Sequence, residues 1–146
     1  MNFKVLGLIL VAALAMAAPS QATAPPILAQ PVAVGKMKAT TIHAQTGSMI
    51  LDSIKIAPGG NFGWHTHGAP VAVVVTQGTL TVFDPTVGAC APFKVSKGQS
   101  FVEPANHVHL ARNDGTTPVK LYALYLGIPK PAAANVPANE PAGCDA

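Results

Sequence analysis

The sequence predicts an all-β fold, a small sandwich or barrel, and three observations lead to that prediction. Segments rich in Val, Ile and Thr are separated by Gly, Pro and Asn at intervals of about eight to twelve residues, a spacing typical of sandwiches and barrels. The run Val71–Gln77 is strongly β-branched and too short for a buried helix, so it is predicted to be an interior strand. No segment has a convincing helical periodicity of apolar residues.

Turn signals bound the predicted strands. Gly47 marks one turn, Pro58–Gly60 a second and Gly68–Pro70 a third. Gly78 alone separates Val71–Gln77 from the next apolar segment, which predicts a hairpin. In chain order, the predicted strands are Ala39–His43, Met49–Ile56, Phe62–His67, Val71–Gln77, Thr79–Phe83, Phe93–Val95, Ser100–Glu103, His107–Arg112 and Val119–Leu126.

A chain of 146 residues is long enough for a single domain. Composition divides it into four segments, one of which is that domain. Residues 1–22 are predicted to be a signal peptide and 23–35 a flexible, Ala- and Pro-containing arm. Residues 36–128 carry the strand pattern and form the predicted domain. Residues 129–146 are a Pro- and Ala-rich tail, expected to be loosely ordered except near Cys144.

The N-terminus has the three parts of a secretory signal. Lys4 supplies the positive charge, Val5–Ala18 is an apolar run, and Ser20–Ala22 offers small residues at the positions that a signal peptidase reads. The run is shorter than the roughly 20 residues that span a bilayer. We therefore expect a secreted or periplasmic protein without stable membrane insertion after cleavage; the alternative is an uncleaved N-terminal anchor.

The chain contains two cysteines, Cys90 and Cys144, an even number that fits an oxidising compartment. They form no CxxC pair, which leaves zinc-finger and thioredoxin-like chemistry without support. We predict a disulfide between them that ties the tail to the domain. By closing a long loop it would stabilise the fold by roughly 4 kcal/mol.

The charge pattern excludes nucleic acid as a partner. The formal net charge is +3, and the lysines are scattered rather than gathered into a basic patch. Aromatic residues are only 5% of the chain against 49% apolar residues, so the core is predicted to be aliphatic.

Four of the five histidines form two pairs, His65 with His67 and His107 with His109. Residues two apart in a strand project from the same face, so each pair presents both imidazoles on one side. Imidazoles that converge from neighbouring strands inside a β-barrel are the arrangement that a metal centre needs. The fifth, His43, is predicted to be a surface residue.

These histidines lie in two motifs that resemble those of the cupin superfamily, a group of small jelly-roll β-barrels. The first motif is glycine, His-x-His, glutamate and glycine at fixed spacings, occupied here by Gly59, His65, His67, Val71 and Gly78. The second is glycine, proline, glycine, histidine and asparagine, occupied by Gly98, Pro104, Asn106, His109 and Asn113. The resemblance implies a single cupin jelly-roll barrel over about residues 36–128.

Two positions depart from the family pattern. Asn106 stands where glycine is usual, and asparagine tolerates the left-handed conformation better than most residues. Val71 stands where the family has a metal-binding glutamate, and valine cannot bind a cation. The resemblance therefore implies a metal site of three histidines, His65, His67 and His109, without that carboxylate.

Such a site suits a divalent transition metal, Zn, Fe, Mn, Ni or Cu, whose identity the sequence leaves open. The alternative is an empty barrel with hydrogen-bonded histidines. His107 is either a fourth ligand or a group that supports the ligands from the pocket rim. Strand parity predicts an apolar pocket lined by Phe62, Trp64, Val71, Val73 and Val75.

The catalytic residues stay unknown. Glu103 and Gln77 are the candidates for acid–base work near the site, and each is expected to face solvent instead. Parity turns Arg112 outward, which leaves no arginine to hold a charged substrate. The favoured function is an exported protein that binds a metal and a small-molecule ligand; the alternative is a three-histidine non-haem iron dioxygenase-like enzyme. A homodimer is a further option, which the sequence does not specify.

Overall fold

The computed structural model describes residues 29–144 and 146. Within them, Pro31–Ala146 form the folded unit, which contains nine strands and one 3₁₀ turn joined by loops. The strands are β1 (Ser48–Ile56), β2 (His65–Thr66), β3 (Val71–Gln77), β4 (Thr79–Phe83), β5 (Phe93–Ser96), β6 (Ser100–Glu103), β7 (Leu110–Arg112), β8 (Val119–Ile128) and β9 (Val136–Pro137), with the turn at Gly88–Cys90. The predicted signal peptide lies outside the described residues. None of the described helical segments has the length and apolar character that crossing a bilayer requires.

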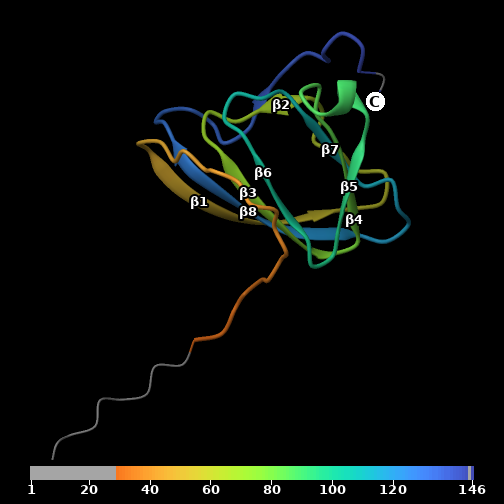
Figure 1. Ribbon diagram of the computed structural model, residues 1–146, viewed down its shortest axis with the longest axis horizontal. Helices are drawn as coiled ribbons and strands as arrows, with labels where there is room; N and C mark the ends of the chain where they lie inside the picture. Colours follow the sequence, from red (N-terminus) through yellow and green to blue (C-terminus); the bar gives the residue numbers. More distant parts are fainter. Residues whose placement is uncertain (1–28, 145) are drawn as a thin grey trace, which may run out of the picture. The chain divides into compact units, whose positions relative to one another are not determined.

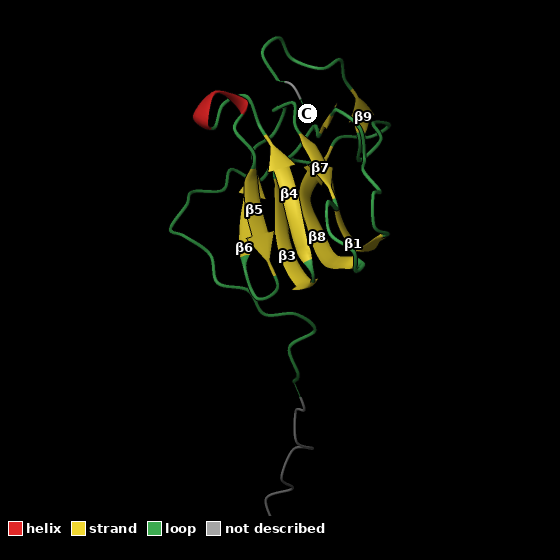
Figure 2. Ribbon diagram, turned by 90° about the vertical axis from the view of Figure 1, so that its right-hand side faces the viewer, coloured by secondary structure: helices red, strands yellow, loops and turns green. Residues whose placement is uncertain are grey.

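The strands form two facing sheets and a small ribbon. One sheet has the order β1-β8-β3-β6 and the other the order β5-β4-β7, and every pairing is antiparallel. The third pair joins β2 to β9. Figure 1 shows the strands arranged around a common interior, and Figure 2 shows β5, β4 and β7 side by side. The all-β prediction is confirmed, and the non-consecutive strand order is that of a jelly roll rather than a simple meander.

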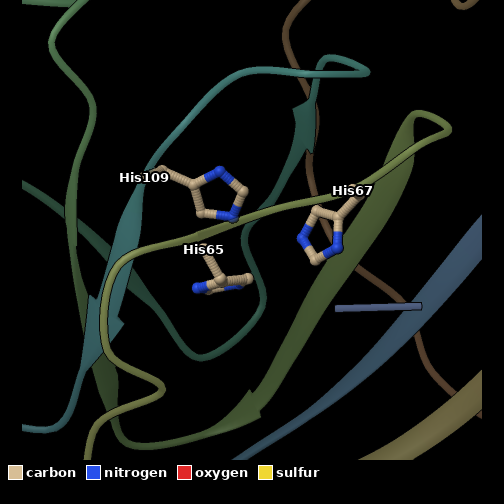
Figure 3. A group of neighbouring side chains, drawn as sticks. All are labelled: His65, His67 and His109. Carbon is tan, nitrogen blue, oxygen red and sulfur yellow. The ribbon is translucent and has the colours of Figure 1, made fainter. Parts of the chain in front are cut away.

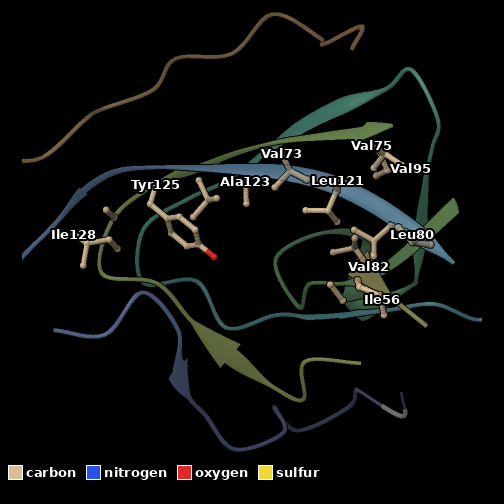
Figure 4. Packing of buried hydrophobic residues seen from close by; sticks show 14 residues of the cluster. Ile56, Val73, Val75, Leu80, Val82, Val95, Leu121, Ala123, Tyr125 and Ile128 are labelled. Atoms are coloured by element: carbon tan, nitrogen blue, oxygen red, sulfur yellow. The ribbon is translucent and has the colours of Figure 1, made fainter. Parts of the chain in front are cut away.

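The core lies between the sheets and is aliphatic, as the composition predicted. Alternate residues of β3 and β8 are buried, which is the period of two that a strand with one face toward the core must have. Val71, Val75 and Val119 are completely buried. The cluster, drawn in Figure 4, comprises Ile56, Ala69, Val71, Val73, Val75, Leu80, Val82, Val95, Ala111, Val119, Leu121, Ala123, Tyr125 and Ile128.

In β1 the inward face is that of Ile50, Ile54 and Ile56, whereas Met49 and Leu51 are exposed. Both faces of this strand carry apolar residues, so alternation alone could not decide which face points inward. The pairing with β8 decides it, because the register places Ile54 beside the buried Leu121.

The prediction of a strand at Ala39–His43 is wrong. Among the described residues before β1, Lys36 forms a parallel bridge to Gln99 and two backbone hydrogen bonds, to Gly98 (2.8 Å) and from Ser100 (2.9 Å), and Gln45 donates to Leu126 at 3.0 Å. Thr40, Thr41 and Ile42 have a high β-propensity, but a strand forms only where another strand offers its backbone groups. His43 is exposed, as predicted.

The two motif asparagines have structural roles. Asn113 is almost fully buried, and its amide donates to the carbonyl groups of Ile56 (3.1 Å) and Thr117 (2.9 Å). Its side-chain oxygen accepts from the backbone N–H of Gly115 at 3.0 Å. The residue therefore satisfies three backbone groups, that of Ile56 among them buried, where β1 ends and β8 begins. Asn106 supports a turn, for which its backbone adopts a left-handed φ of 62°.

The turn at Asn106 carries the first testable prediction. Replacement by valine should destabilise the protein by about 1–2 kcal/mol, because a β-branched side chain disfavours a positive φ. Replacement by glycine should change stability by no more than about 0.5 kcal/mol, because glycine adopts this conformation without steric conflict. Urea unfolding followed by circular dichroism measures both, and equal stabilities of the two variants would contradict the prediction.

Candidate metal centre

Three histidines from two distant segments of the chain meet between the sheets. His65 and His109 pair with each other through both backbone hydrogen bonds, His65 N–H to His109 C=O at 3.0 Å and the reverse at 2.9 Å. Directly opposed residues in an antiparallel pair share a face, and His67 joins that face because it lies two residues beyond His65. Figure 3 shows the three rings pointing toward one another.

The convergence is close. The ring centroids are 4.5 Å apart for His65 and His109, 4.9 Å for His65 and His67, and 5.0 Å for His67 and His109. One ring nitrogen from each side chain can be chosen so that all three lie within 4.8 Å of one another. All three side chains are buried. The predicted convergence of His65, His67 and His109 is therefore confirmed, and the group could hold a metal ion.

A backbone carbonyl fixes each ring. The Nδ1 atom of His65 lies 2.9 Å from the carbonyl oxygen of Gly63, that of His67 lies 2.8 Å from Ala134, and that of His109 lies 3.0 Å from His107. A carbonyl oxygen only accepts, so each Nδ1 must carry the proton and donate. In a neutral imidazole this leaves Nε2 with a free lone pair, which is the tautomer of a metal ligand oriented by an outer hydrogen bond.

The remaining nitrogens fit a metal ion. The Nε2 atoms of His67 and His109 are buried and have no hydrogen-bond partner among the described residues. Buried polar atoms nearly always have a hydrogen-bond partner. Two buried nitrogens without one, both facing the same interior point, are therefore suited to bind a cation. Burial also lowers the pKa of His65 below its ordinary value of 6.5, an effect reinforced by His109 and His67 and opposed by the carbonyl of Gly63 and by Glu103. His65 is therefore neutral at neutral pH, as a ligand must be.

Glu103 lies in the site, contrary to the expectation that it faces solvent. Its carboxylate oxygens are 3.2 Å from Nε2 of His67 and 3.4 Å from Nε2 of His109, and its side chain is 11% exposed. Its position follows from the pairing of β6 with β3, because residues directly opposed in a sheet share a face, and the sequence alone did not give that pairing. The other candidate, Gln77, instead donates its amide to the carbonyl of Pro118 at 3.2 Å.

Tyr125 borders the histidines from β8. Its ring contacts that of His67 edge to face, with centroids 5.2 Å apart, and its hydroxyl donates to the side-chain oxygen of Asn135 at 3.4 Å. Burial raises the pKa of Tyr125 to about 12, with smaller contributions from the charges of Asp52 and Glu103, and the hydrogen bond to Asn135 opposes the rise. The hydroxyl is therefore a neutral donor beside the site.

This pKa predicts the stability of the protein in alkali. An unfolded tyrosine ionises near pH 10, so above that pH the unfolded chain has lost a proton that the native state still holds. The contribution of Tyr125 is full below pH 10 and falls by about 1–2 kcal/mol as the pH rises through about 12. Urea unfolding from pH 9 to 12 should show this loss in the wild type and less of it in Tyr125→Phe. Parallel curves for the two proteins would contradict the prediction.

His107 does not place its side chain in the cluster. Its ring lies outside the group of three, and the Nδ1 atom is buried without a hydrogen-bond partner. Its contribution is the backbone carbonyl that orients His109. His107 therefore acts on the cluster through its backbone carbonyl, a role that the sequence did not predict for it.

A cavity of about 180 Å³ borders Glu103 and His109, and a smaller one of about 30 Å³ borders His65 and His67. The smaller cavity is lined by Ile54, Phe62, His65, His67, Val73, Leu80, Glu103, Ala111, Leu121, Ala123, Tyr125 and Asn135. It holds an ion or one or two waters, whereas pockets for organic ligands measure about 300–1,000 Å³. A hollow of about 500 Å³ lies between Lys36–Thr40 and the strands β5 and β6, and its lining contains none of the histidines.

The predicted pocket lining needs correction. Phe62 and Val73 border the smaller cavity, whereas Val71 and Val75 are completely buried in the core. Trp64 packs against a second cluster of Phe83, Cys90, Leu110 and Cys144. Its place follows from parity, because the residue before His65 must point to the opposite side of the strand.

The C-terminal tail is part of the site, and the expectation of loose order does not hold for its described residues. Strand β9 pairs with β2, placing Val136 beside Thr66 and Pro137 beside His65. Ala134 supplies the carbonyl that holds His67. The predicted disulfide is present between Cys90 and Cys144, with Cα atoms 5.4 Å apart, and it indicates an oxidising compartment.

Arg112 is directed away from the histidines, as parity predicted. Its guanidinium lies 4.6 Å from the centre of the Phe83 ring, and its Nε forms an ion pair with Asp114 at 2.7 Å. Phe83 belongs to the second cluster, and Asp114 is an exposed residue that follows β7. No arginine among the described residues therefore lines either cavity beside the histidines.

Comparisons with solved structures give the same fold. The chain is similar to a conserved protein with a double-stranded β-helix domain from Klebsiella pneumoniae (18% identity, TM-score 0.52, 65% of this chain and 78% of that chain). It is similar to the polyketide cyclase RemF from Streptomyces resistomycificus (14%, 0.53, 68% and 66%) and to the DMSP lyase DddQ from Ruegeria pomeroyi (18%, 0.52, 64% and 44%). The chain thus spans less than half of the lyase. At these identities the likeness shows the fold alone.

No curated protein matches the sequence. The family model described as the cupin domain matches residues 53–125, which is half of the chain and includes both histidine motifs. Together with the facing antiparallel sheets and the three converging histidines, this match shows that the chain belongs to the cupin superfamily.

Proposed function

We propose that this protein is an exported cupin that binds one divalent transition metal through Nε2 of His65, His67 and His109. The observation that carries the proposal is the pair of buried, unpartnered Nε2 atoms on rings whose tautomer is fixed by backbone carbonyls. Three imidazoles suit Zn, Fe, Mn, Ni or Cu rather than Mg or Ca. When bound, such an ion supplies a Lewis acid in a buried site.

Metal analysis of the protein tests the proposal directly. Protein purified without chelator or nickel resin, or reconstituted afterwards, should contain close to one equivalent of a transition metal. The measurement is elemental analysis after extensive dialysis against metal-free buffer. Less than about a tenth of an equivalent of every metal after reconstitution would overturn the proposal and favour the empty barrel with hydrogen-bonded histidines.

The small-molecule ligand is proposed in a restricted form. The cavities that border the histidines measure about 30 and 180 Å³, which admit water or a small ligand. The dioxygenase-like alternative needs more room, because pockets for organic substrates measure about 300–1,000 Å³. We therefore expect iron-loaded protein to consume no oxygen above background with thiols, diketones or catechols. Turnover of one of these substrates would favour the enzyme instead.

Export rests on the disulfide and on the predicted signal peptide. A bridge between Cys90 and Cys144 forms and persists in an oxidising compartment. Protein recovered from the producing cell's exterior or periplasm should begin near Thr23. An intact mass that still includes residues 1–22 would show that the segment is retained as an anchor. Sedimentation of the same sample tests the homodimer, which stays a prediction.

A further inference from the structure

The family's missing carboxylate has a replacement on the neighbouring strand. Val71 occupies the glutamate position of the first motif and lies in β3, between β6 and β8. The register sets Glu103 of β6 directly opposite Val71 on one side and Tyr125 of β8 opposite on the other. Opposed residues of an antiparallel sheet project from the same face, so Glu103 enters the interior beside the position that valine leaves without a ligand atom.

The distances fit shared coordination. Two donor atoms bound to one tetrahedral Zn²⁺ at about 2.0–2.1 Å are about 3.4 Å apart. The two carboxylate oxygens of Glu103 lie 3.2 Å from Nε2 of His67 and 3.4 Å from Nε2 of His109. Neither contact is a hydrogen bond, since both nitrogens lack a hydrogen-bond partner. The spacing is therefore that of two ligands around a common ion.

The electrostatics lead to the same conclusion. The Nδ1 atoms of both imidazoles donate to backbone carbonyls, so in the neutral ring, the form that binds metal, Nε2 is an acceptor, as are the oxygens of a carboxylate. Lone pairs that face each other in a largely buried site repel, and a carboxylate that is 11% exposed needs a positive partner. No lysine or arginine pairs with Glu103 in the described part of the chain. A cation between the acceptors satisfies all of them at once.

We propose that Glu103 is the fourth protein ligand of the metal, so that this chain has moved the carboxylate of the site from β3 to β6. The inference rests on the proposed function and specifies its donor set as three imidazoles and one carboxylate. The added negative charge strengthens binding of a dication. The carboxylate also raises the affinity of the site for Fe²⁺ and Mn²⁺, which favour oxygen ligands more than Cu⁺ or Zn²⁺ do.

The test compares Glu103→Gln with the wild type and with Glu140→Gln, which alters the chain's other glutamate, an exposed residue of the tail. Co²⁺ is the probe, because its visible d–d absorption reports the ligand set, and a chelator competition gives the affinity. Glu103→Gln should bind Co²⁺ at least about 100-fold more weakly than the wild type and should have an altered absorption spectrum. A direct ligand should cost at least as much affinity as the loss of an outer-shell partner, which costs up to about 100-fold. Glu140→Gln should match the wild type in both.

A relocation variant makes the assignment sharper. Val71→Glu combined with Glu103→Val returns the carboxylate to the motif position while keeping one valine and one glutamate in the opposed pair. It should recover most of the affinity that Glu103→Gln loses. If Glu103→Gln does not fold, Glu103→Asp replaces it, and should show weakened binding because its carboxylate is one methylene farther from the histidines.

The outcomes separate the two proposals. A wild type that binds no Co²⁺ overturns the metal-binding function itself. A wild type that binds Co²⁺ while Glu103→Gln, or Glu103→Asp in its place, binds it with equal affinity and an unchanged spectrum overturns the role of Glu103 and leaves the three-histidine site standing. A loss confined to the Glu103 variants, with recovery in the relocation variant, supports both.

Discussion

Replacing His109 with alanine is expected to weaken transition-metal binding by about two to three orders of magnitude, because a four-ligand site distributes about 10–16 kcal/mol over its ligands. The thermal stabilisation by metal should fall with it to about a third or less. A ligand at 1,000 times its Kd stabilises the native state by about 4 kcal/mol, which corresponds to roughly 10–20 °C in a chain of this size. Calorimetry with and without added metal, combined with a chelator competition, measures both effects.

Two other histidines provide controls for this experiment. His43→Ala removes an exposed imidazole and should leave affinity and the metal-induced shift unchanged. His107→Ala should also retain metal, because only its backbone carbonyl contacts His109. A His109 variant that keeps the wild-type metal-induced shift, or a His107 variant that loses it, would show that the ligand set is wrong.

Removing the disulfide is the change with the next largest expected effect. The cysteines are 54 residues apart, and opening a loop of this length should lower the free energy of unfolding by about 4 kcal/mol in the chain-entropy model. The variant Cys90→Ser with Cys144→Ser should therefore unfold at a clearly lower urea concentration. Equilibrium unfolding of the metal-free proteins isolates this effect from that of the ion.

The same variant should also hold metal less well, because it frees the tail that fixes His67. The carbonyl of Ala134 orients that ring, and loss of such an outer partner costs about 10- to 100-fold in affinity. Wild-type protein treated with a reductant is the matched control and should behave like the serine variant. Unfolding free energies within about 1 kcal/mol of each other, with equal metal affinity, would show that the tail stays in place without the bridge.

Strand pairing explains which sequence expectations held and which did not. Val71–Gln77 and Thr79–Phe83 were found from their sequence because their β-branched residues and the intervening Gly78 are local signals. Ala39–His43 has similar residues and forms no strand, because no neighbouring backbone is there to pair with it. The tail was misjudged for the opposite reason, since β9 has little intrinsic propensity and exists through its partner β2.

By itself the sequence determined the all-β class from local strand and turn signals and the disulfide from its two cysteines, and the resemblance of its two histidine motifs to the cupins indicated which three histidines meet. Only the tertiary structure decided that Glu103 faces these histidines and that Ala134 orients one of them. Those contacts depend on which strands are neighbours and in what register. Pairing between distant segments is fixed by the packing of the whole barrel rather than by any one segment.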